Sequence, residues 1–203
     1  MSFGTHARKV RDPALPYGRR ISALARCVQL YRPLGYRATF AYLAEVAGPF
    51  RHDETALLRA LEALSTSRNL WQASLRGYAD RRRAAKRLGR RRPGAAEVDP
   101  NPPAWWYGDV RRAALCTIGF LLRERDPIAR ADVEVVRLAS AVLENHGAIS
   151  AFEEQQLAAL RHRFEALRKA SAWPTVDLHD LHTALESLWV LRQIANATAG
   201  CAP

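Results

Sequence analysis

The sequence predicts a mainly α-helical protein of about seven helices, and the spacing of its apolar residues is the main reason. Apolar residues recur three and four positions apart through most of the 203 residues, as they do on the buried face of a helix. Residues that start helices precede these stretches, and proline or glycine follows them. Alternation typical of a β-strand does not persist over five residues, with Asn69–Leu75 as the one exception.

The first 88 residues are predicted to form a basic helical region that begins with an N-terminal arm. The arm, residues 1–18, combines basic residues with prolines and glycines, so we expect it to be irregular. Apolar residues at helical spacing then predict a helix over Arg19–Arg32, and Pro33 ends it.

Two further helices are predicted before residue 89. Thr39 is placed to cap a short helix over Phe40–Ala47. Asp53 is placed to cap the next helix, whose apolar stripe consists of leucines. The polar Ser65–Ser67 leaves two alternatives open, because this helix either breaks there or continues to about Leu88.

Residues 89–103 are predicted to be a linker because they are rich in proline, glycine and arginine. Residues 104–203 are predicted to form a helical bundle around Trp105–Arg125, which is apolar nearly all round in its middle. The remaining predicted boundaries are a break at Asp126–Pro127, a helix over Ile128–Asn145, a stop at Gly147, a capping box of Ser150 with Glu153, a break at Trp173–Pro174 and a cap at Asp177.

Composition excludes several classes of protein. Hydrophobic residues make up 48% and charged residues 25% of the chain, which is ordinary for a globular protein and excludes wholesale disorder. No apolar run approaches the roughly 18 residues of a membrane span, and the first residues have no apolar signal core. The three cysteines, Cys27, Cys116 and Cys201, have neither disulfide-framework nor zinc-site spacing. We therefore expect a cytoplasmic protein with no membrane association.

Charge is the strongest functional signal in the sequence. The formal net charge is +11, but residues 1–95 hold 20 basic and 6 acidic residues, whereas residues 96–203 hold 11 and 14. Such an asymmetry predicts a nucleic-acid partner or, less often, an anionic membrane surface. Of the 31 basic residues 28 are arginine, which contacts phosphate in a bidentate manner. A GC-rich genome explains the choice of arginine over lysine equally well, but it does not explain the charge excess.

A cluster of basic residues over 81–92 is the main candidate site, with eight cations in twelve residues and no acid. Cations that replace the counterions of phosphates favour binding through ion release. The candidate residues of this cluster are Arg81, Arg82, Arg83, Lys86, Arg87, Arg90, Arg91 and Arg92. A second candidate patch consists of Arg8, Lys9, Arg11, Arg19 and Arg20. The aromatic Trp105–Tyr107 either stacks on bases or, as we favour, belongs to the core.

No catalytic or metal site is evident in the sequence, and we predict neither an enzyme nor a cofactor. His179, His182 and Glu186 lie at helical spacing and are the one candidate metal cluster. A fourth ligand is missing, so we interpret them as a solvated helix face and assign no metal ligand.

The segments 40–47 and 54–64 also have the pattern of a helix-turn-helix, with 69–75 as a wing. In that reading the second helix would face DNA. That helix would present the acidic Asp53, Glu54 and Glu62 to the DNA, with Arg59 as the only cation of the helix. Acidic residues are unfavourable in the major groove. A double-stranded DNA-binding regulator is therefore our alternative hypothesis.

Three stretches resemble blocks of the small helical subunit of the type I-E CRISPR Cascade interference complex. Arg51–Asn69 is similar to the first block of that family, Phe120–Asp126 with Val136–Leu138 to a later block, and Val176–Trp189 to its last helix. The long basic segment 78–103 departs from the family pattern. The resemblance implies a non-enzymatic subunit that holds guide RNA and displaced single-stranded DNA by their backbones, with Arg59 at the matching basic position.

Taken together, these observations predict a nucleic-acid-binding accessory subunit of a ribonucleoprotein. It would bind single-stranded DNA or RNA without reading sequence, and it would contact protein partners, including copies of itself, through the bundle. A structural protein whose basic segment is incidental is a third hypothesis. A metal enzyme built on His179 and His182 ranks last.

Overall fold

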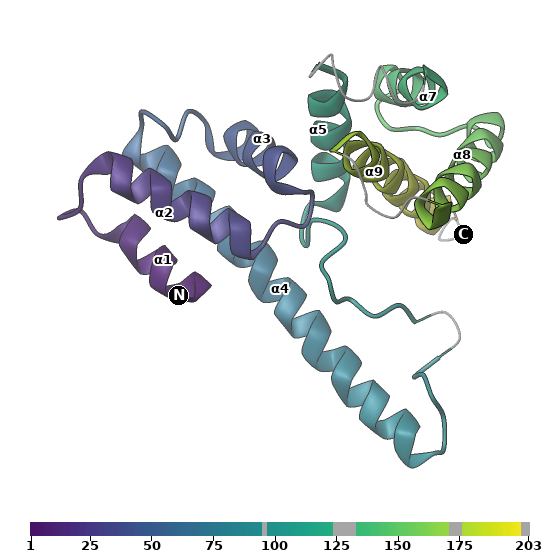
Figure 1. Cartoon of the computed structure of the whole chain (residues 1–203), viewed down its shortest axis with the longest axis horizontal. Coiled ribbons are helices and arrows are strands. Elements are labelled where there is room, and N and C mark those ends of the chain that lie inside the picture. Colours follow the sequence, from purple (N-terminus) through teal and green to yellow (C-terminus); the bar gives the residue numbers. More distant parts are fainter. Residues whose placement is uncertain (95–96, 124–132, 171–175, 200–203) are drawn as a thin grey trace. The chain divides into compact units, whose positions relative to one another are not determined.

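The structure is a computed structural model that describes residues 1–94, 97–123, 133–170 and 176–199. Within these ranges it contains eight α-helices and no strand, which confirms the predicted mainly α fold class. The chain divides into two compact units, Met1–Gly108 and Asp109–Pro203. Each unit has its own core and is described by itself (Figure 1). The predicted linker, residues 89–103, lies inside the first unit.

The first unit contains α1 (Phe3–Arg11), α2 (Tyr17–Leu30), α3 (Tyr36–Ala47) and α4 (Glu54–Arg87). The three shorter helices pack around the N-terminal half of α4, whose C-terminal half extends beyond them (Figure 1). With 34 residues, α4 is about 50 Å long, because an α-helix rises 1.5 Å per residue.

The prediction of an irregular arm over residues 1–18 is wrong, because α1 is a regular helix. Its first turn is capped by Ser2, whose hydroxyl accepts a hydrogen bond from the Thr5 backbone N–H at 3.3 Å. Phe3, Ala7 and Val10 are spaced four and three apart, and this stripe is buried. Burial against neighbouring elements thus stabilises a segment whose own apolar signal is short.

The start of α3 also differs from the prediction that Thr39 caps it. Gly35 occupies the N-cap position, with a φ of 82° that favours glycine, and Thr39 is fully buried inside the helix. The first turn of α4 is as predicted, because the Asp53 carboxylate accepts a hydrogen bond from Thr55 N at 2.8 Å.

Beyond Ser65–Ser67, α4 continues without a break, so the longer of the two alternatives is correct and the predicted wing over 69–75 is wrong. The polar residues are accommodated because Ser67 is buried with partners: its hydroxyl bonds the Tyr31 hydroxyl at 2.9 Å. The same oxygen accepts from the Tyr107 backbone N–H at 3.0 Å.

After α4 the chain returns along the helix, and we call residues 97–107 the covering segment. The Trp71 indole N–H donates to the Pro100 carbonyl at 2.8 Å, which fastens this segment to the middle of α4. Trp106 is 4% exposed and packs edge-on against Tyr42, with ring centres 4.7 Å apart. The segment Trp105–Tyr107 lies before α5, because this helix begins at Val110 and not, as predicted, at Trp105.

The second unit contains α5 (Val110–Arg123), α7 (Val133–Glu144), α8 (Ala151–Ala170) and α9 (Val176–Ala199). Its core draws on all four helices, with Ile118, Val142, Leu157, Leu185 and Leu188 among the most deeply buried side chains. The predicted central helix is confirmed in that α5 supplies buried residues to this core.

The predicted capping box is confirmed: Glu153 Oε2 accepts from Ser150 N at 2.7 Å, and Ser150 Oγ accepts from Glu153 N at 3.3 Å. Gly147 follows α7 with a φ of 86°, as expected for the stop predicted there. The predicted breaks at Asp126–Pro127 and Trp173–Pro174 lie outside the described residues. Asp177, which is predicted to cap the last helix, lies within α9, and the residues that precede this helix lie outside the described ones.

Candidate nucleic-acid interface

Positive charge is concentrated in the first unit. Residues 1–108 hold 20 basic and 8 acidic residues, a net charge of +12, whereas residues 109–203 hold 11 and 12, a net charge of −1. The charge asymmetry of the sequence thus coincides with the division of the fold into two units, and the candidate interface belongs to the first.

The predicted cluster at 81–92 lies on the last two turns of α4 and the residues just after them. Ala85 is the one buried residue of these turns, and it marks the face of α4 turned toward protein. Arg81 pairs with Glu97 of the covering segment, and Arg83 pairs with Asp80 one turn earlier. The cluster is therefore partly neutralised by carboxylates of its own unit.

Six cations of the cluster are exposed and form no ion pair within the part of the chain that the structure describes. They are Arg82, Lys86, Arg87, Arg90, Arg91 and Arg92. Helical spacing places Arg76, Arg83 and Arg87 on the side of α4 opposite Ala85, away from the covering segment. The exposed side of the helix end is therefore mostly positive, and Asp80, which pairs with Arg83, lies on the same side.

Backbone hydrogen bonds at the end of α4 fix the conformation of Gly89 and Arg90, where the second half of the cluster begins. Gly89 has a φ of 71°, its N–H bonds Lys86 O at 3.0 Å, and the Arg90 N–H bonds Ala85 O at 2.9 Å. This pair of bonds is a Schellman motif, which satisfies the last carbonyls of a helix. Lys86 and Arg87 in the last turn also complement the negative end of the helix dipole.

The second predicted patch needs one correction, because Arg20 is not available to bind a ligand. Its side chain is 4% exposed, its Nε donates to Val10 O at 2.8 Å, and its Nη2 lies 2.7 Å from Glu54 Oε1. The distance to Glu54 is that of an ion pair, although the angle at Nη2 falls outside that of a hydrogen bond. Arg20 joins α1, α2 and α4, and its role is structural.

The other predicted cations of this patch are exposed: Arg8, Lys9, Arg11 and Arg19. Arg59 is also exposed, with its guanidinium 3.9 Å from Asp53 on the first turn of α4. Arg26 and Arg76 are also exposed and were not among the predicted cations. Each lies seven residues from a chosen cation, Arg19 and Arg83 respectively, and this spacing places both members of a pair on one helix face.

Of the three aromatic residues before α5, Trp106 belongs to the core, as we favoured for the segment, whereas Trp105 and Tyr107 are half-buried. Trp106 is buried, and the Trp105 and Tyr107 rings stack on each other with centres 5.7 Å apart. Burial raises the pKa of Tyr107. One face of each of the Trp105 and Tyr107 rings is covered by the other ring.

The residues considered for a metal are engaged otherwise. The His182 ring stacks on Phe164 at 5.3 Å, and Glu186 pairs with Arg161 at 2.9 Å, while the His179 side chain lies outside the described residues. Across the described ranges no group of three or more His, Cys, Asp or Glu side chains is placed to hold a metal ion. Cys27 is buried, and its burial raises the thiol pKa to about 11, so it is protonated and unreactive.

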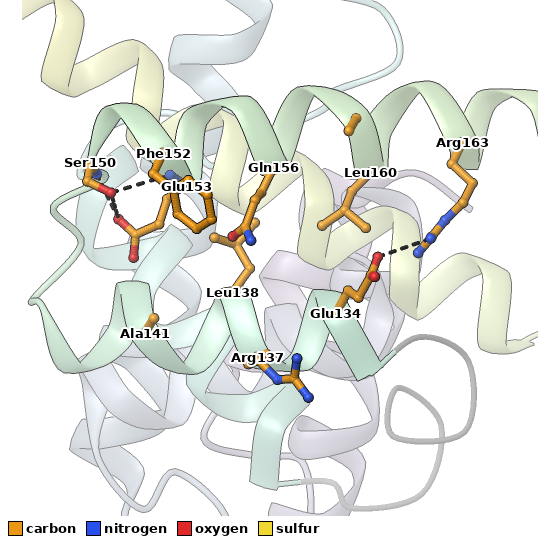
Figure 2. A pocket seen from close by; sticks show the side chains of 11 residues that line it. Glu134, Arg137, Leu138, Ala141, Ser150, Phe152, Glu153, Gln156, Leu160 and Arg163 are labelled. Atoms are coloured by element: carbon orange, nitrogen blue, oxygen red, sulfur yellow. Dashed lines mark hydrogen bonds and ion pairs between the residues drawn. The ribbon is translucent and has the colours of Figure 1, made fainter.

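The second unit has a groove of its own between α7 and α8, with a volume of about 600 Å³ (Figure 2). Leu138 and Leu160 lie within it, and Phe152, which is 69% exposed, stands at its mouth. The two acidic residues that line it have partners in the same unit: Glu134 forms an ion pair with Arg163 at 3.0 Å, and Glu153 accepts a hydrogen bond from Ser150. The groove has a mixed lining, because Arg137, Ser150 and Gln156 line it together with these apolar side chains.

The helix pair considered as a helix-turn-helix exists as α3 and α4, which pack on each other. The N-terminal turn of α4 is acidic, and Glu54 is engaged by the buried Arg20. Comparison with protein-family models, with curated proteins and with solved structures finds no match. In the described part of the chain, no helix has the length and apolar character needed to cross a membrane.

Proposed function

We propose that this chain is a non-enzymatic nucleic-acid-binding subunit of a ribonucleoprotein, which binds the backbone of single-stranded DNA or RNA. The observation that carries the proposal is the set of six exposed cations at and just after the end of α4, which form no ion pair with any residue that the structure describes. In a folded unit of net charge +12, such a set is a favourable place for phosphates to displace their counterions.

The composition of the cluster supports backbone binding over base reading. Direct readout of bases uses asparagine, glutamine and acidic side chains as well as arginine. Residues 81–92 contain only cations, alanine, leucine and glycine, so the cluster has no amide or acid with which to read a base.

The subunit role, in the manner of the CRISPR small subunit that the sequence resembles, is part of the same proposal. The near-neutral second unit would contact protein partners or a second copy, while the first unit supplies the cationic surface. Sequence would then be read by base pairing elsewhere in the assembly.

The test is a salt series of binding to labelled single-stranded DNA, single-stranded RNA and duplex DNA. With about six phosphate contacts, log K is expected to fall by about 4 per tenfold rise in salt for a single strand. In the triple variant Arg90→Gln/Arg91→Gln/Arg92→Gln, the slope is expected to become shallower by about 2. These residues follow the helix end, so the variant keeps α4 intact.

The matched control is Arg123→Gln/Arg137→Gln/Arg163→Gln, which removes the same charge from exposed positions of the second unit. We expect the control to keep the salt slope of the unmodified chain. Equal loss in both variants would mean that only net charge matters, and would overturn the assignment to α4. Tight binding to one duplex sequence would favour the DNA-binding regulator instead.

A further inference from the structure

A crevice of about 570 Å³ lies between α1 and α2 on the first unit. The two helices run antiparallel, since Arg20 of α2 reaches Val10 and Cys27 reaches Phe3. Lys9 of α1 lines the crevice opposite Arg19 and Arg26 of α2. Its other lining residues include His6 and the apolar Leu15 and Pro16 of the connecting turn. This size is typical of sites that take a small molecule or one nucleotide.

The charges of the crevice are not neutralised by the protein itself. The Lys9 ammonium lies 3.8 Å from the Met1 thioether sulfur, and Arg26 Nη1 donates to the Gln29 amide oxygen at 2.7 Å. Both of these partners are neutral. Among the described residues Lys9, Arg19 and Arg26 form no ion pair, and no carboxylate lines the crevice. Three cations around one hollow without a counter-charge favour an anionic ligand.

The imidazole of His6 lines this positive crevice, and its pKa is lowered there. Burial lowers its pKa most, and the positive charges of Lys9, the Met1 amino group and Arg26 lower it further. An adjacent crevice lined by Met1, His6 and Arg26 continues the same surface toward the start of α1. The positive surface therefore extends along the α1–α2 pair and is not limited to one side chain.

The spacing of the cations selects phosphate among the anions. Arg19 and Arg26 lie seven residues apart, which is about 10 Å along α2 and on the same face. Two anionic groups match that distance better than one does, and a nucleotide with a phosphate on each side supplies two. Guanidinium groups also match phosphate by two parallel hydrogen bonds. Leu15 and Pro16 give the crevice an apolar wall against which a nucleoside fits.

We propose that the crevice between α1 and α2 binds one nucleotide of a nucleic-acid strand, with its flanking phosphates against Lys9, Arg19 and Arg26. The crevice is a second, separate contact to the strand besides the end of α4. As a contact to a strand it rests on the proposed function, but as a phosphate site it stands on its own geometry.

The experiment is an NMR titration of the His6 imidazole in the full chain with the tetranucleotide (dT)4, and in parallel with inorganic phosphate. We expect a saturable shift of the His6 resonances with (dT)4 and a rise of the His6 pKa by about one pH unit, because phosphate favours the imidazolium form. Linkage then makes (dT)4 affinity rise up to about tenfold as the pH falls from 7.5 to 5. The charged groups that face His6 or share its crevice are Lys9, Arg19, Arg26 and the Met1 amino group.

The test variant is Arg19→Gln/Arg26→Gln, which is expected to lower (dT)4 affinity at least tenfold. The matched control is Arg32→Gln/Arg51→Gln, which removes two exposed cations of the first unit that do not line the crevice, and it is expected to bind as before. Circular dichroism on each variant verifies that the helices are retained.

A His6 shift that persists in the Arg19→Gln/Arg26→Gln variant would overturn the proposal, as would the absence of any saturable shift. A response to inorganic phosphate without one to (dT)4 would make this a free-phosphate site and overturn the strand contact. In the Arg90→Gln/Arg91→Gln/Arg92→Gln variant the His6 response should remain. Failure at the crevice is thereby distinguished from failure of the proposed function at the end of α4.

Discussion

Replacing Arg20 by methionine is expected to unfold the first unit more easily while leaving its ligand-binding surface intact. The side chain is 4% exposed, and its Nε donates to Val10 O at 2.8 Å. Val10 lies in the last turn of α1, where carbonyls lack helical partners, so Arg20 satisfies a carbonyl that water does not easily reach. Methionine keeps the apolar stem and removes only the charged head.

The expected loss is about 2–4 kcal/mol. A hydrogen bond to a charged group contributes about 1.5–3 kcal/mol, and the abandoned Val10 carbonyl adds its own desolvation cost. The Glu54 partner adds little, because its side chain is 55% exposed and is hydrated once Arg20 is removed. With a urea m-value of about 1.5 kcal/mol per molar, the unfolding midpoint is expected to fall by about 2 M.

The assay is urea unfolding followed by circular dichroism at 222 nm, with the neighbouring exposed Arg19→Gln as the control, which is expected to change the unfolding free energy by less than about 0.5 kcal/mol. The reasoning would be refuted by an Arg20→Met protein that unfolds at the wild-type midpoint but has lost nucleic-acid affinity. That result would place Arg20 in the binding surface and not between the helices.

Three further variants or conditions test the packing of each unit. Burial raises the pKa of Tyr31 to about 12. Between pH 10 and 12 the Tyr31 phenol would ionise in the unfolded chain but stay protonated in the folded one, so the free energy of unfolding should fall as the pH rises over this range. Gly147→Ala should cost about 1–2 kcal/mol, because the residue has a φ of 86° and an added Cβ would lie 3.1 Å from Leu115 Cδ2. Ser150→Ala should cost about 1 kcal/mol by removing the capping box with Glu153.

Each of these has a measurement that decides it. Absorbance at 295 nm follows the tyrosine titration, and a Tyr31 that ionises near pH 10 in the folded protein would contradict its burial. Thermal unfolding compares Gly147→Ala with Gly18→Ala, where an added Cβ meets nothing within 4 Å, and equal costs would exclude backbone strain as the cause. For Ser150→Ala, Ser150→Thr is the control, because threonine also caps helices and should keep most of the stability.

Much of the fold was predictable because helix starts are local events. The caps at Asp53 and Ser150 depend on side chains two or three residues from the N–H groups they accept from, so the sequence contains both partners. Thr39 shows the limit of this reasoning, because its hydroxyl has the chemistry of a cap but the helix starts earlier at Gly35. The helix α1 was missed because its apolar stripe gains its stability from packing on α2 and α4, which no local pattern expresses.

The positions of the positive charges were predictable from the sequence, but which of these cations are free to bind a ligand was not. The pairing of Arg83 with Asp80 at a spacing of three was within reach of the sequence, whereas Arg81 pairs with Glu97 sixteen residues away. The burial of Arg20 also depends on where α1 and α4 pack, so adjacent arginines with identical chemistry have different roles. Counting charges finds the positive unit, and only the packing shows which cations are free to bind.

The way α4 ends has a consequence for the thermodynamics of binding. A disordered arginine-rich segment must be ordered when it binds, at about 1–2 kcal/mol per residue for the backbone. Residues 81–87 are already helical, and the turn at Gly89 fixes the backbone as far as Arg90. Association should therefore show a small change in heat capacity and no gain in helix signal at 222 nm, unlike a segment that folds upon binding.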